Sequence, residues 1–488
     1  MSNEVVIVGG GPGGYSAALH LAGKGARVAL VEGHHLGGVC LNYGCIPTKT
    51  LIASTTLLDK MQRAGEYGLV NEGRVRPDME KIMARKDTVI RNQIKGLTEA
   101  MQKKRINLLE GWAEIRPGKE LRITSAKGEV SSLPYDKLIL APGGKPLDLP
   151  GFTPDLKRIL SSDQALKLAE IPGRMLIVGG GVIACEFAFI FKRLGAEVTL
   201  VEAMDRLLPL ASVDRDCSRL LQREMKKSKI EFFLNKGVKD WEETGDGLQV
   251  RIGASPFQKD PPEKSQQVLT RVVDTILVCV GRSPNTAGLG LEQAGVETDH
   301  RGWIKVNDRM QTSAQGVYAV GDALGPDRIM LAHVAAREGE VAAGNILGQK
   351  EFMDYRAVPG AIFTSPEVAF VGLTEEQAKD CVGNYGVQNV LMRTQGKAQA
   401  MGEISGQLKL VYDRDNRKIL GVHLVGPQAT ELVAEATLAV EAELSLETVS
   451  RTIHAHPTLS EAMQEAAKKA EREDAGKRHG AWSMGHGA

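Results

Sequence analysis

Apolar residues along the chain follow two different periods. Short continuous apolar runs, such as residues 4–8 (EVVIV) and 174–178 (RMLIV), are typical of buried parallel strands. Each run is followed by glycines, then by apolar residues at helical spacing, and then by a second apolar run. Residues 4–32 and 174–202 therefore each predict one strand–helix–strand unit, and their similarity indicates an internal duplication.

The rest of the chain has a different pattern. We expect a helix that begins near Pro47 and a charged helical region over residues 77–104. Residues 257–268 are polar and predict an exposed loop inside a strand-rich stretch. After about residue 350, alternating strands precede helices rich in Ala, Leu and Glu, which indicates a separate α+β domain.

The first unit carries a glycine pattern that suits a dinucleotide. Gly9, Gly11 and Gly14 form G-x-G-x-x-G between a strand and a helix. Such glycines permit a tight turn, the approach of backbone to a pyrophosphate, and close packing of helix on strand. Glu32 ends the next strand, where an acidic side chain can bind ribose hydroxyls. A glycine-rich turn alone would explain the motif, but the complete unit favours a nucleotide site.

The second unit repeats the pattern. Gly179, Gly181 and Ala184 give the accepted G-x-G-x-x-A variant, so we expect two dinucleotides in one chain. Glu202 would repel a 2′-phosphate and accept hydrogen bonds from a 2′-hydroxyl, which favours NAD(H) over NADP(H). Arg206 lies nearby in the sequence and leaves NADP(H) open as an alternative.

Two cysteines stand five positions apart in residues 37–49, GGVCLNYGCIPTK. In a regular helix such positions lie farther apart than the ~7 Å Cα separation that a disulfide tolerates. A bond between Cys40 and Cys45 would need a distorted turn, which Gly44 permits. Pro47 suits a first helical turn, where Cys45 would have a lowered thiol pKa. We therefore expect a pair poised for thiol–disulfide exchange, with two unpaired core thiols or half of a metal site as the alternatives.

Composition narrows the class of protein. The 488 residues include 61 Lys and Arg against 60 Asp and Glu, a balance that argues against a nucleic-acid or anionic-membrane partner. No stretch reaches the roughly 18 apolar residues of a membrane span, and no signal region opens the chain. Six cysteines are too few for a disulfide scaffold of this size, so we expect a cytoplasmic protein.

Together these motifs resemble the pyridine nucleotide–disulfide oxidoreductase family, and within it the enzymes that oxidise dihydrolipoamide. The similarity extends to about residue 465. GGVCLNYGCIPTK resembles the redox signature of the family, and the further matches are VGRSPNT (280–286), VYAVGDA (317–323), FTSPEVAFVGLTEEQA (363–378) and HAHPTLSE (454–461), which resemble its later FAD-domain, dimerisation-domain and acid–base motifs.

The resemblance implies an α/β fold with two Rossmann-like dinucleotide-binding domains, for FAD and NAD, and a C-terminal α+β dimerisation domain. The expected bounds are residues 1–150 and 283–349 for the FAD-binding domain, 151–282 for the NAD-binding domain, 350–470 for the dimerisation domain and 471–488 for a disordered tail.

The resemblance also implies the catalytic roles. Cys40 would be the thiol that meets substrate and Cys45 the thiol next to the flavin, joined in a redox-active disulfide. His456 would be the base and Glu461 its orienting carboxylate, while His454 is the local rival for the base. A histidine whose pKa lies near the working pH suits proton abstraction from a thiol, and a carboxylate on its far N–H favours the imidazolium.

Five further positions are implied at the cofactor sites. Lys49 and Glu186 would form an ion pair beside the flavin ring, where Lys49 would stabilise the reduced, anionic ring. Asp322 is expected on the ribityl chain, and Gly143 and Gly281 at the ends of FAD-domain strands.

The implied reaction is oxidation of protein-bound dihydrolipoamide to lipoamide with reduction of NAD⁺ to NADH, without a metal. The implied partners are a second copy of the chain and a lipoylated carrier, from a 2-oxoacid dehydrogenase complex, glycine cleavage or another lipoyl-binding system. Enzymes that reduce glutathione usually carry a cationic 2′-phosphate site, and those that reduce mercuric ion a C-terminal cysteine pair, whereas no cysteine follows Cys381. A flavoprotein acting only as a scaffold would need neither the cysteine pair nor His456.

Overall fold

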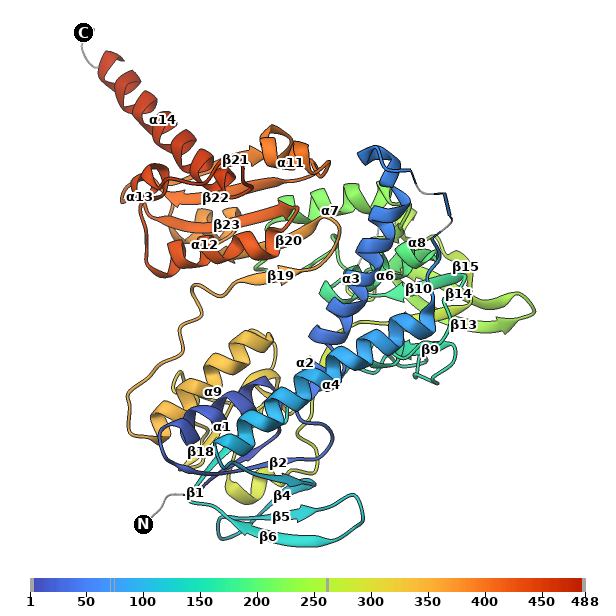
Figure 1. Cartoon of the computed structure of the whole chain (residues 1–488), viewed down its shortest axis with the longest axis vertical. Coiled ribbons are helices and arrows are strands. Elements are labelled where there is room, and N and C mark those ends of the chain that lie inside the picture. The colour runs from blue at the N-terminus through green and yellow to red at the C-terminus, as the bar shows by residue number, and fades with distance from the viewer. Residues whose placement is uncertain (1–3, 71, 74, 260–262, 485–488) are drawn as a thin grey trace. The chain divides into compact units, whose positions relative to one another are not determined.

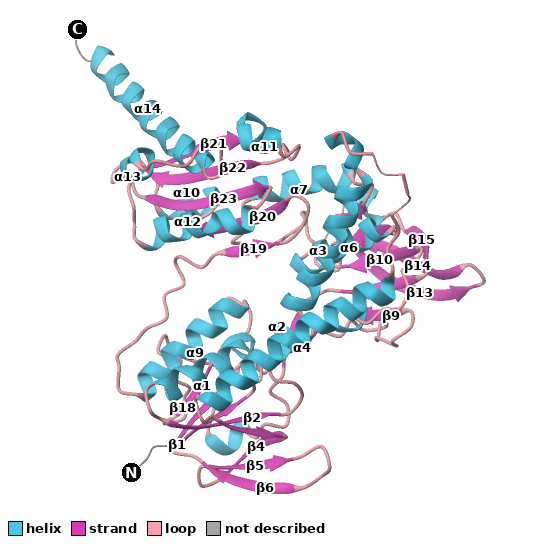
Figure 2. Cartoon of the chain, in the orientation of Figure 1, coloured by secondary structure: helices cyan, strands magenta, loops and turns pink. Residues whose placement is uncertain are grey.

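The computed structural model describes residues 4–70, 72–73, 75–259 and 263–484 (Figures 1 and 2). It divides into two compact units, Met1–Ile171 with Val280–Tyr355, and Pro172–Cys279 with Arg356–Ala488. The first unit combines the two segments assigned to the FAD-binding domain, and the second combines the NAD-binding and dimerisation segments. The chain crosses between units after residues 171 and 279, where the sequence suggested 150 and 282.

The first unit is built on a parallel sheet in the order β18–β7–β1–β2–β3. The side chains of Val5, Val6 and Ile7 in its central strand are fully buried, as expected for a parallel strand covered on both faces. The strands are β1 (Glu4–Val8), β2 (Arg27–Glu32), β3 (Asn107–Glu110), β7 (Lys137–Leu140) and β18 (Val317–Ala319).

Helices of the first unit connect and cover these strands. Helices α1 (Pro12–Gly23) and α9 (Ala332–Ile346) approach so closely that a Cβ on Gly339 would lie 2.3 Å from the Gly13 carbonyl oxygen. The two helices expected near Pro47 and over 77–104 are α3 (Cys45–Gln62) and α4 (Met79–Lys103), which lie side by side in Figure 1. The remaining elements include α2 (Gly38–Asn42), the antiparallel sheet β4 (Trp112–Arg116), β5 (Glu120–Thr124) and β6 (Val130–Pro134), the pair β8 (Gly144–Pro146) and β17 (Arg282–Pro284), and the short η3 (Gly321–Leu324).

The second unit opens with another parallel arrangement, in which β10 lies between β11 and β16, and β12 pairs with β11. The predicted loop over 257–268 joins two antiparallel strands and contains the short helix α8 (Glu263–Gln266); residues 260–262 lie outside the described residues. The elements are β10 (Arg174–Val178), α6 (Val182–Leu194), β11 (Glu197–Val201), α7 (Arg215–Lys227), β12 (Glu231–Phe233), β13 (Lys236–Thr244), β14 (Gly247–Ala254), β15 (Leu269–Val273) and β16 (Thr275–Val278).

The C-terminal part of the second unit is the expected α+β domain. Its antiparallel sheet runs in the order β19–β20–β23–β22–β21, and helices pack on it around a core that includes Tyr412 and Leu424. The elements are β19 (Gly360–Ile362), β20 (Glu367–Gly372), α10 (Glu375–Cys381), β21 (Tyr385–Leu391), α11 (Gly396–Ala400), β22 (Gln407–Asp413), β23 (Ile419–Gly426), α12 (Ala429–Glu441), α13 (Leu446–Arg451) and α14 (Glu461–Met484). The α/β fold class predicted from the sequence is confirmed.

A buried lysine joins the two parts of the second unit. Lys409 of β22 is 3% exposed, and its Nζ lies 2.9 Å from Asp214 Oδ1, 2.5 Å from Asp216 Oδ2 and 2.7 Å from Glu375 Oε2. Asp214 caps the N-terminus of α7 and Glu375 opens α10. Removing Lys409 would leave three neighbouring carboxylates without their counter-charge, so the cluster ties α7 to the antiparallel sheet.

The expected tail over 471–488 differs from the structure, in which α14 continues to Met484. Its residues up to Asp474 are mostly strong helix formers, and Asp474 is 6% exposed. The Asp474 carboxylate accepts a hydrogen bond from the Tyr412 hydroxyl at 3.1 Å and pairs with Arg414. Contacts of the dimerisation domain therefore extend past the expected boundary at 470; residues 485–488 lie outside the described residues.

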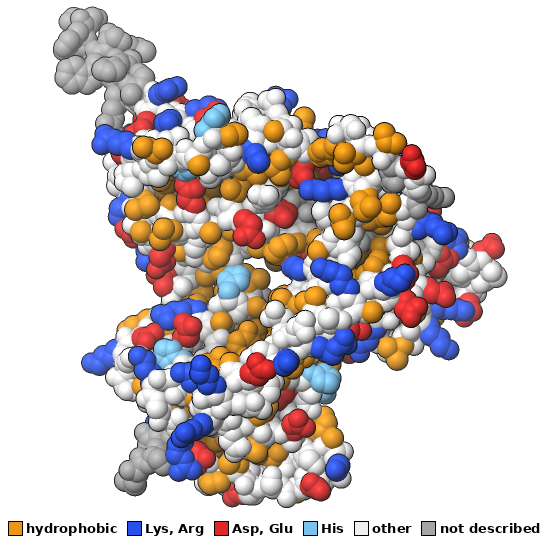
Figure 3. Space-filling view, in the orientation of Figure 1, with side chains coloured by type: hydrophobic (Ala, Val, Ile, Leu, Met, Phe, Trp, Pro, Cys, Tyr) orange, Lys and Arg blue, Asp and Glu red, His pale blue; other side chains and the backbone are white. Residues whose placement is uncertain are grey.

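The described helices and one face of the surface can be compared with the sequence. None of the helices in the described part of the chain has the length and apolar character that a membrane crossing requires. On the face drawn in Figure 3, basic and acidic side chains are interspersed.

Candidate active site

The first glycine loop leaves room at the N-terminus of α1. A Cβ on Gly9 would lie 2.1 Å from the Ala141 carbonyl oxygen, and one on Gly14 would lie 1.9 Å from the Gly9 carbonyl oxygen, so both positions require glycine. A Cβ on Gly11 would meet nothing closer than the Gly38 Cα at 3.9 Å. Helix α1 has no side-chain cap, so its first N–H groups face this open space. These residues fit the pyrophosphate of FAD.

Glu32 lies at the end of β2 beside this loop. Its Oε2 accepts a hydrogen bond from Gly10 N at 2.6 Å, and its Oε1 accepts one from His34 N at 2.7 Å. The two backbone donors hold the carboxylate at the carboxyl edge of the sheet, where nucleotides bind in this type of fold. The position fits the ribose role that the sequence predicts.

The second glycine loop has the same construction. Gly180 N donates to Glu202 Oε2, and Met204 N donates to Glu202 Oε1 at 2.7 Å. Gly179 (φ +113°) forms the turn by donating to Val201 O at 2.8 Å. A Cβ on Gly181 would have nothing within 4 Å, and α6 has no side-chain cap. Burial raises the pKa of Glu202, although backbone N–H groups oppose the shift.

The sequence left NADP(H) as an alternative cofactor because of Arg206. In the structure the Arg206 guanidinium is hydrogen-bonded to other residues of the protein. Its guanidinium donates to the carbonyl oxygens of Val213 and Leu210, each at 2.8 Å, and to Ser218 Oγ at 3.1 Å. The side chain therefore stabilises the turn before α7.

The two cysteines are brought together at the start of α3. Cys45 is the first residue of this helix, as the sequence predicts, and Gly44 separates it from α2. The structure holds them as two thiols, with Cys40 hydrogen-bonded to Cys45. A hydrogen bond with Cys45 raises the pKa of the Cys40 thiol, together with burial and the Cys45 charge; Lys49 opposes the shift and Asp322 adds to it. The raised pKa of Cys40 follows because its hydrogen bond and burial outweigh Lys49, and the lowered pKa expected for Cys45 stays a prediction.

Tyr15 is a neighbour that the sequence reasoning missed. Burial raises the pKa of its phenol, and the charges of Cys40 and Cys45 raise it further. Tyr15 follows Gly14 directly on α1, so the only signal in the sequence was its place beside the glycine motif. The thiols thus lie near the helix whose N-terminus fits the pyrophosphate.

Asp322 lies in η3, which follows β18. Its Oδ2 is 3.1 Å from Arg282 Nε, and Arg282 also donates to the Gly144 carbonyl oxygen. Gly143 (φ +71°) accepts a hydrogen bond from Asn285 N at 3.1 Å, which holds the Ala141-Pro142-Gly143 loop against the second FAD-domain segment.

Gly281 lies on the connection that returns the chain to the first unit, just before β17. It has φ +130°, and its carbonyl oxygen accepts a hydrogen bond from Leu147 N at 3.0 Å. Gly281 and Gly143 therefore border the paired strands β8 and β17.

The second unit holds the predicted acid–base pair. His456 Nδ1 is 2.9 Å from Glu461 Oε1, and Thr458 N donates to Glu461 Oε2 at 2.9 Å. The Thr458 N–H and then His456 lower the pKa of Glu461. The His456 side chain is 78% exposed, so its ring is accessible to solvent.

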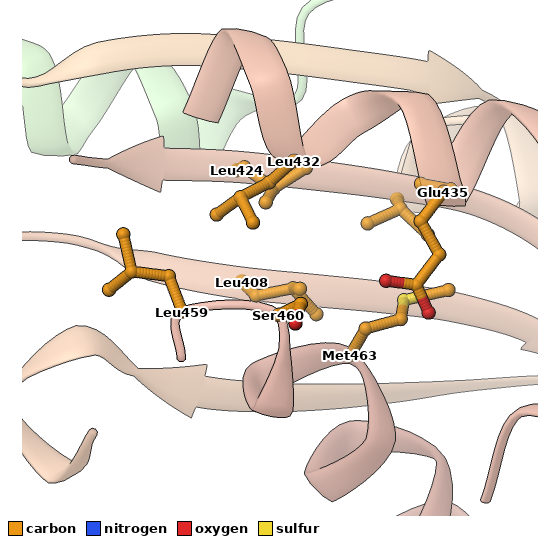
Figure 4. Close-up of a pocket in the computed structure, with 9 residues that line it drawn as sticks. Leu408, Leu424, Leu432, Glu435, Leu459, Ser460 and Met463 are labelled. Carbon is orange, nitrogen blue, oxygen red and sulfur yellow. The ribbon is translucent and has the colours of Figure 1, made fainter. Parts of the chain in front are cut away.

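His454 is engaged on both ring nitrogens. Its Nε2 lies 2.7 Å from Glu435 Oε1 and its Nδ1 lies 3.0 Å from Thr452 O, while only 5% of the side chain is exposed. A small pocket lies beside this pair, lined mostly by aliphatic side chains and including Glu435, Leu459 and Ser460 (Figure 4). The geometry of His454 therefore suits a structural role better than proton transfer.

The two residues predicted to form an ion pair lie in different units. Lys49 lies on α3 of the first unit. Glu186 lies on α6 of the second unit, is 3% exposed and accepts a hydrogen bond from Phe363 N at 3.0 Å. Their pairing stays a prediction. Within the described residues, no group of three or more His, Cys, Asp or Glu side chains is arranged to hold a metal ion.

The fold and these sites identify the family. The chain belongs to the pyridine nucleotide–disulphide oxidoreductases: the family model matches residues 3–339, and the model of the family's dimerisation domain matches residues 358–467. It is therefore an FAD-dependent flavoprotein disulfide reductase that uses a nicotinamide dinucleotide, and its dimerisation domain supports a homodimer.

Similar proteins cover nearly the whole chain. The dihydrolipoyl dehydrogenase of Thermus scotoductus is 40% identical over 466 residues, which cover 95% of this chain and 96% of that protein. Dihydrolipoyl dehydrogenase 2, a mitochondrial protein of Arabidopsis thaliana, is 38% identical over 467 residues, which cover 95% of this chain and 90% of that protein. The crystal structure of LpdA from Mycobacterium tuberculosis matches with a TM-score of 0.87 at 29% identity, covering 96% of this chain and 99% of that one.

Proposed function

We propose that this protein is a dihydrolipoyl dehydrogenase, which oxidises dihydrolipoamide on a carrier protein to lipoamide and reduces NAD⁺ to NADH. The observation that carries the proposal is the adjacent pair Cys40 and Cys45 at the start of α3, near Lys49 and Asp322 and close to the glycine helix. The similar dihydrolipoyl dehydrogenases support it.

In the proposed reaction the oxidised enzyme carries a Cys40–Cys45 disulfide. A substrate thiolate attacks Cys40 Sγ, the S–S bond breaks, and Cys45 leaves as a thiolate. The second substrate thiol, once deprotonated, attacks the substrate sulfur of the mixed disulfide, which releases lipoamide and the Cys40 thiolate. Two electrons now reside on the cysteine pair, and bound FAD supplies the chemistry that transfers them to NAD⁺ and restores the disulfide.

The base in this proposal is His456. Each substrate thiol must lose a proton before it attacks. His456 accepts the first proton, releases it to solvent from its exposed ring and then accepts the second, while Glu461 holds the ring through Nδ1. His454 is the weaker candidate because both of its nitrogens are engaged and its side chain is buried.

We propose that each active site combines two subunits. His456 is exposed on the domain that matches the family's dimerisation model, and it lies far along the chain from the cysteines. A symmetric dimer can place His456 and Glu461 of one copy at Cys40 and Cys45 of the other, twice, with a single self-complementary surface.

The preferred nicotinamide cofactor is NAD⁺. The Glu202 carboxylate, held by two backbone donors, would accept hydrogen bonds from a 2′-hydroxyl and repel a 2′-phosphate. Arg206 is engaged by three acceptors of the protein, which weakens the case for a phosphate site there.

A steady-state assay tests the proposal. Dihydrolipoamide with NAD⁺ should give a high kcat/KM, whereas glutathione disulfide or mercuric ion with NADPH should give little turnover. A carrier domain bearing reduced lipoyl groups should be oxidised, and the same domain without its lipoyl group, which is the matched control, should not react. Turnover confined to glutathione disulfide or mercuric ion would refute the assignment.

A further inference from the structure

A carboxyl group deep in the first unit has no part in the chemistry described above. Glu338 lies on α9 and is 1% exposed. Its Oε2 accepts a hydrogen bond from Gly321 N at 2.7 Å, and its Oε1 accepts one from the Tyr355 hydroxyl at 2.6 Å. Both carboxylate oxygens are therefore engaged, on two different segments of the chain.

The first of these segments carries Asp322. Gly321 has φ +76° and begins η3, so its N–H is the donor at the entrance to the turn on which Asp322 lies. The turn also lies beside the first glycine loop, because a Cβ on Gly13 would come within 2.9 Å of Val320 Cγ2. The bond from Gly321 to Glu338 therefore fixes the turn relative to the helix N-terminus that fits the pyrophosphate.

The second segment is the end of the first unit. Tyr355 is the last residue of that unit before the chain enters the second. Its ring lies under the Arg328 guanidinium, 5.1 Å from the ring centroid, and Arg328 pairs with Asp308 at 3.0 Å. A polar chain thus runs from a partly exposed ion pair through Tyr355 and Glu338 to Gly321.

Burying this carboxyl group has a cost. Desolvation raises the pKa of Glu338 to about 7, even though the Tyr355 hydroxyl, the Gly321 N–H and Arg328 lower it. An apolar residue of similar size would avoid the cost but would leave the Gly321 N–H and the Tyr355 hydroxyl without their acceptor. The group is thus suited to hold these two donors and not simply to fill space.

We propose that Glu338 is a positioning residue for the flavin site, which acts through Gly321 on the turn that carries Asp322 and ties this turn to the end of the unit at Tyr355. The proposal rests on the flavin role that the sequence resemblance predicts for Asp322, and it does not depend on which disulfide the enzyme reduces.

The first test measures the rate at which FAD leaves the diluted holoenzyme, followed by the rise in flavin fluorescence. Glu338→Ala leaves the Gly321 N–H without an acceptor, so release should be roughly tenfold to hundredfold faster than in the wild type. Glu338→Gln offers a carbonyl oxygen to Gly321 and an amide N–H to the Tyr355 oxygen, and should restore most of the retention. Glu340→Gln, on the same helix but in the exposed pair with Arg337, is the matched control and should not change the rate.

A double-mutant cycle with Asp322→Ala separates positioning from general stability. If Glu338 acts through the Asp322 turn, Glu338→Ala should accelerate release by no more than about threefold when Asp322 is already alanine. An equal acceleration in both backgrounds, or none in the wild-type background, would overturn the proposal. Tyr355→Phe removes the other bond of Glu338 and repeats the cycle if Glu338→Ala does not accumulate as folded protein. The steady-state assay with dihydrolipoamide is scored separately, so failure of the substrate assignment would leave this result readable.

Discussion

The two strand–helix–strand units of this chain have nearly the same internal hydrogen bonds. In both, the first glycine donates to the residue before the terminal glutamate at 2.8 Å, from Gly9 to Val31 and from Gly179 to Val201. In both, that glutamate accepts the N–H of the next glycine and the N–H two residues beyond itself. The glycine turn and its glutamate, Gly9–Gly14 with Glu32 and Gly179–Ala184 with Glu202, are here called the cradle. The chain thus forms the same local arrangement twice.

The units differ in what surrounds the cradle. The first has Gly14 where the second has Ala184, because in the first a Cβ would collide with the Gly9 carbonyl oxygen. After its glutamate, the first unit continues to the helices that carry Cys40 and Cys45, whereas the second continues to the turn held by Arg206. The comparison shows that the two turns share their internal hydrogen bonds, and that the cysteine pair follows only the first of them.

The largest expected effect is the loss of turnover when a cysteine that follows the first cradle is replaced, compared with a cysteine of the second. Cys40→Ser and Cys45→Ser should each reduce kcat with dihydrolipoamide by at least ~10³-fold, because neither variant can form the disulfide. In the reduced enzyme, a long-wavelength absorbance band from a thiolate next to the flavin should survive in Cys40→Ser and disappear in Cys45→Ser. Cys185→Ser, on α6 of the second unit, is the control and should retain turnover. Equal loss of the band in both active-site variants would contradict the assigned roles.

The next effect tests whether the base that serves the cysteines of one copy comes from the same chain or from the partner subunit. Neither the Cys45→Ser homodimer nor the His456→Gln homodimer should turn over appreciably. Purified, differently tagged heterodimers of the two variants should regain one working site of two, about half of the wild-type kcat per dimer, because one interface pairs intact cysteines with an intact histidine. Heterodimers no more active than their parents would rule out the shared site.

A matched pair of substitutions tests the steric difference between the cradles. Gly14→Ala places a methyl group 1.9 Å from the Gly9 carbonyl oxygen and should destabilise the FAD-binding unit by about 3 kcal/mol or more. Ala184→Gly, the reverse change in the second unit, should cost only about 1 kcal/mol of helix propensity. Thermal unfolding and FAD content check both variants, and equal losses would mean that the cradles tolerate the same residues.

Alanine substitutions of Glu202 and Glu32 should affect the binding of different nucleotides, NAD⁺ and FAD respectively. Glu202→Ala should lower kcat/KM for NAD⁺ roughly tenfold, about 1.4 kcal/mol, and should reduce the preference for NAD⁺ over NADP⁺. Glu32→Ala should accelerate FAD release and leave the KM for NAD⁺ almost unchanged. If the KM for NAD⁺ increased only in Glu32→Ala, Glu32 and not Glu202 would be the residue that binds NAD⁺.

The smallest expected effect concerns pH. Because burial raises the pKa of Glu202, this carboxylate gains a proton at a higher pH than an exposed glutamate as the solution is acidified. Protonation weakens its acceptance of ribose hydrogen bonds, so the KM for NAD⁺ should rise a few-fold, by roughly 0.5–1 kcal/mol, as the solution is acidified. The KM of Glu202→Gln should not vary with pH over the same range. A wild-type KM that is as flat as that of the variant would show that Glu202 stays charged.

Local patterns predicted much of this structure. Strand periodicity located β1 and β10, the glycine spacing located both cradles, and the glycine and proline around Cys45 located the start of α3. The bond between His456 and Glu461 also spans only five residues. Each of these features depends on neighbours in the chain, which is the kind of information that a sequence pattern holds.

Contacts between distant segments were beyond the sequence. Nothing near Glu338 indicates that it binds Gly321 and Tyr355, and nothing near Lys409 indicates its three carboxylates. The end of α14 was misjudged for the same reason, since Asp474 is held by partners on the antiparallel sheet. These bonds depend on which elements pack together, and a carboxylate on a helix gives no sign of its partner.

The close approach of α1 to α9 has a consequence for synthesis on the ribosome. The compact first unit, residues 1–171 and 280–355, has β18 beside β7 and Gly339 of α9 against Gly13. Its core therefore cannot form completely until the chain has been translated to about residue 346. At 5–20 residues per second, the strands up to β7 wait roughly 10–40 s for these elements. During that interval a nascent chain exposes the strand edge that β18 will cover, so chaperones and proteases have their longest access to the N-terminal half.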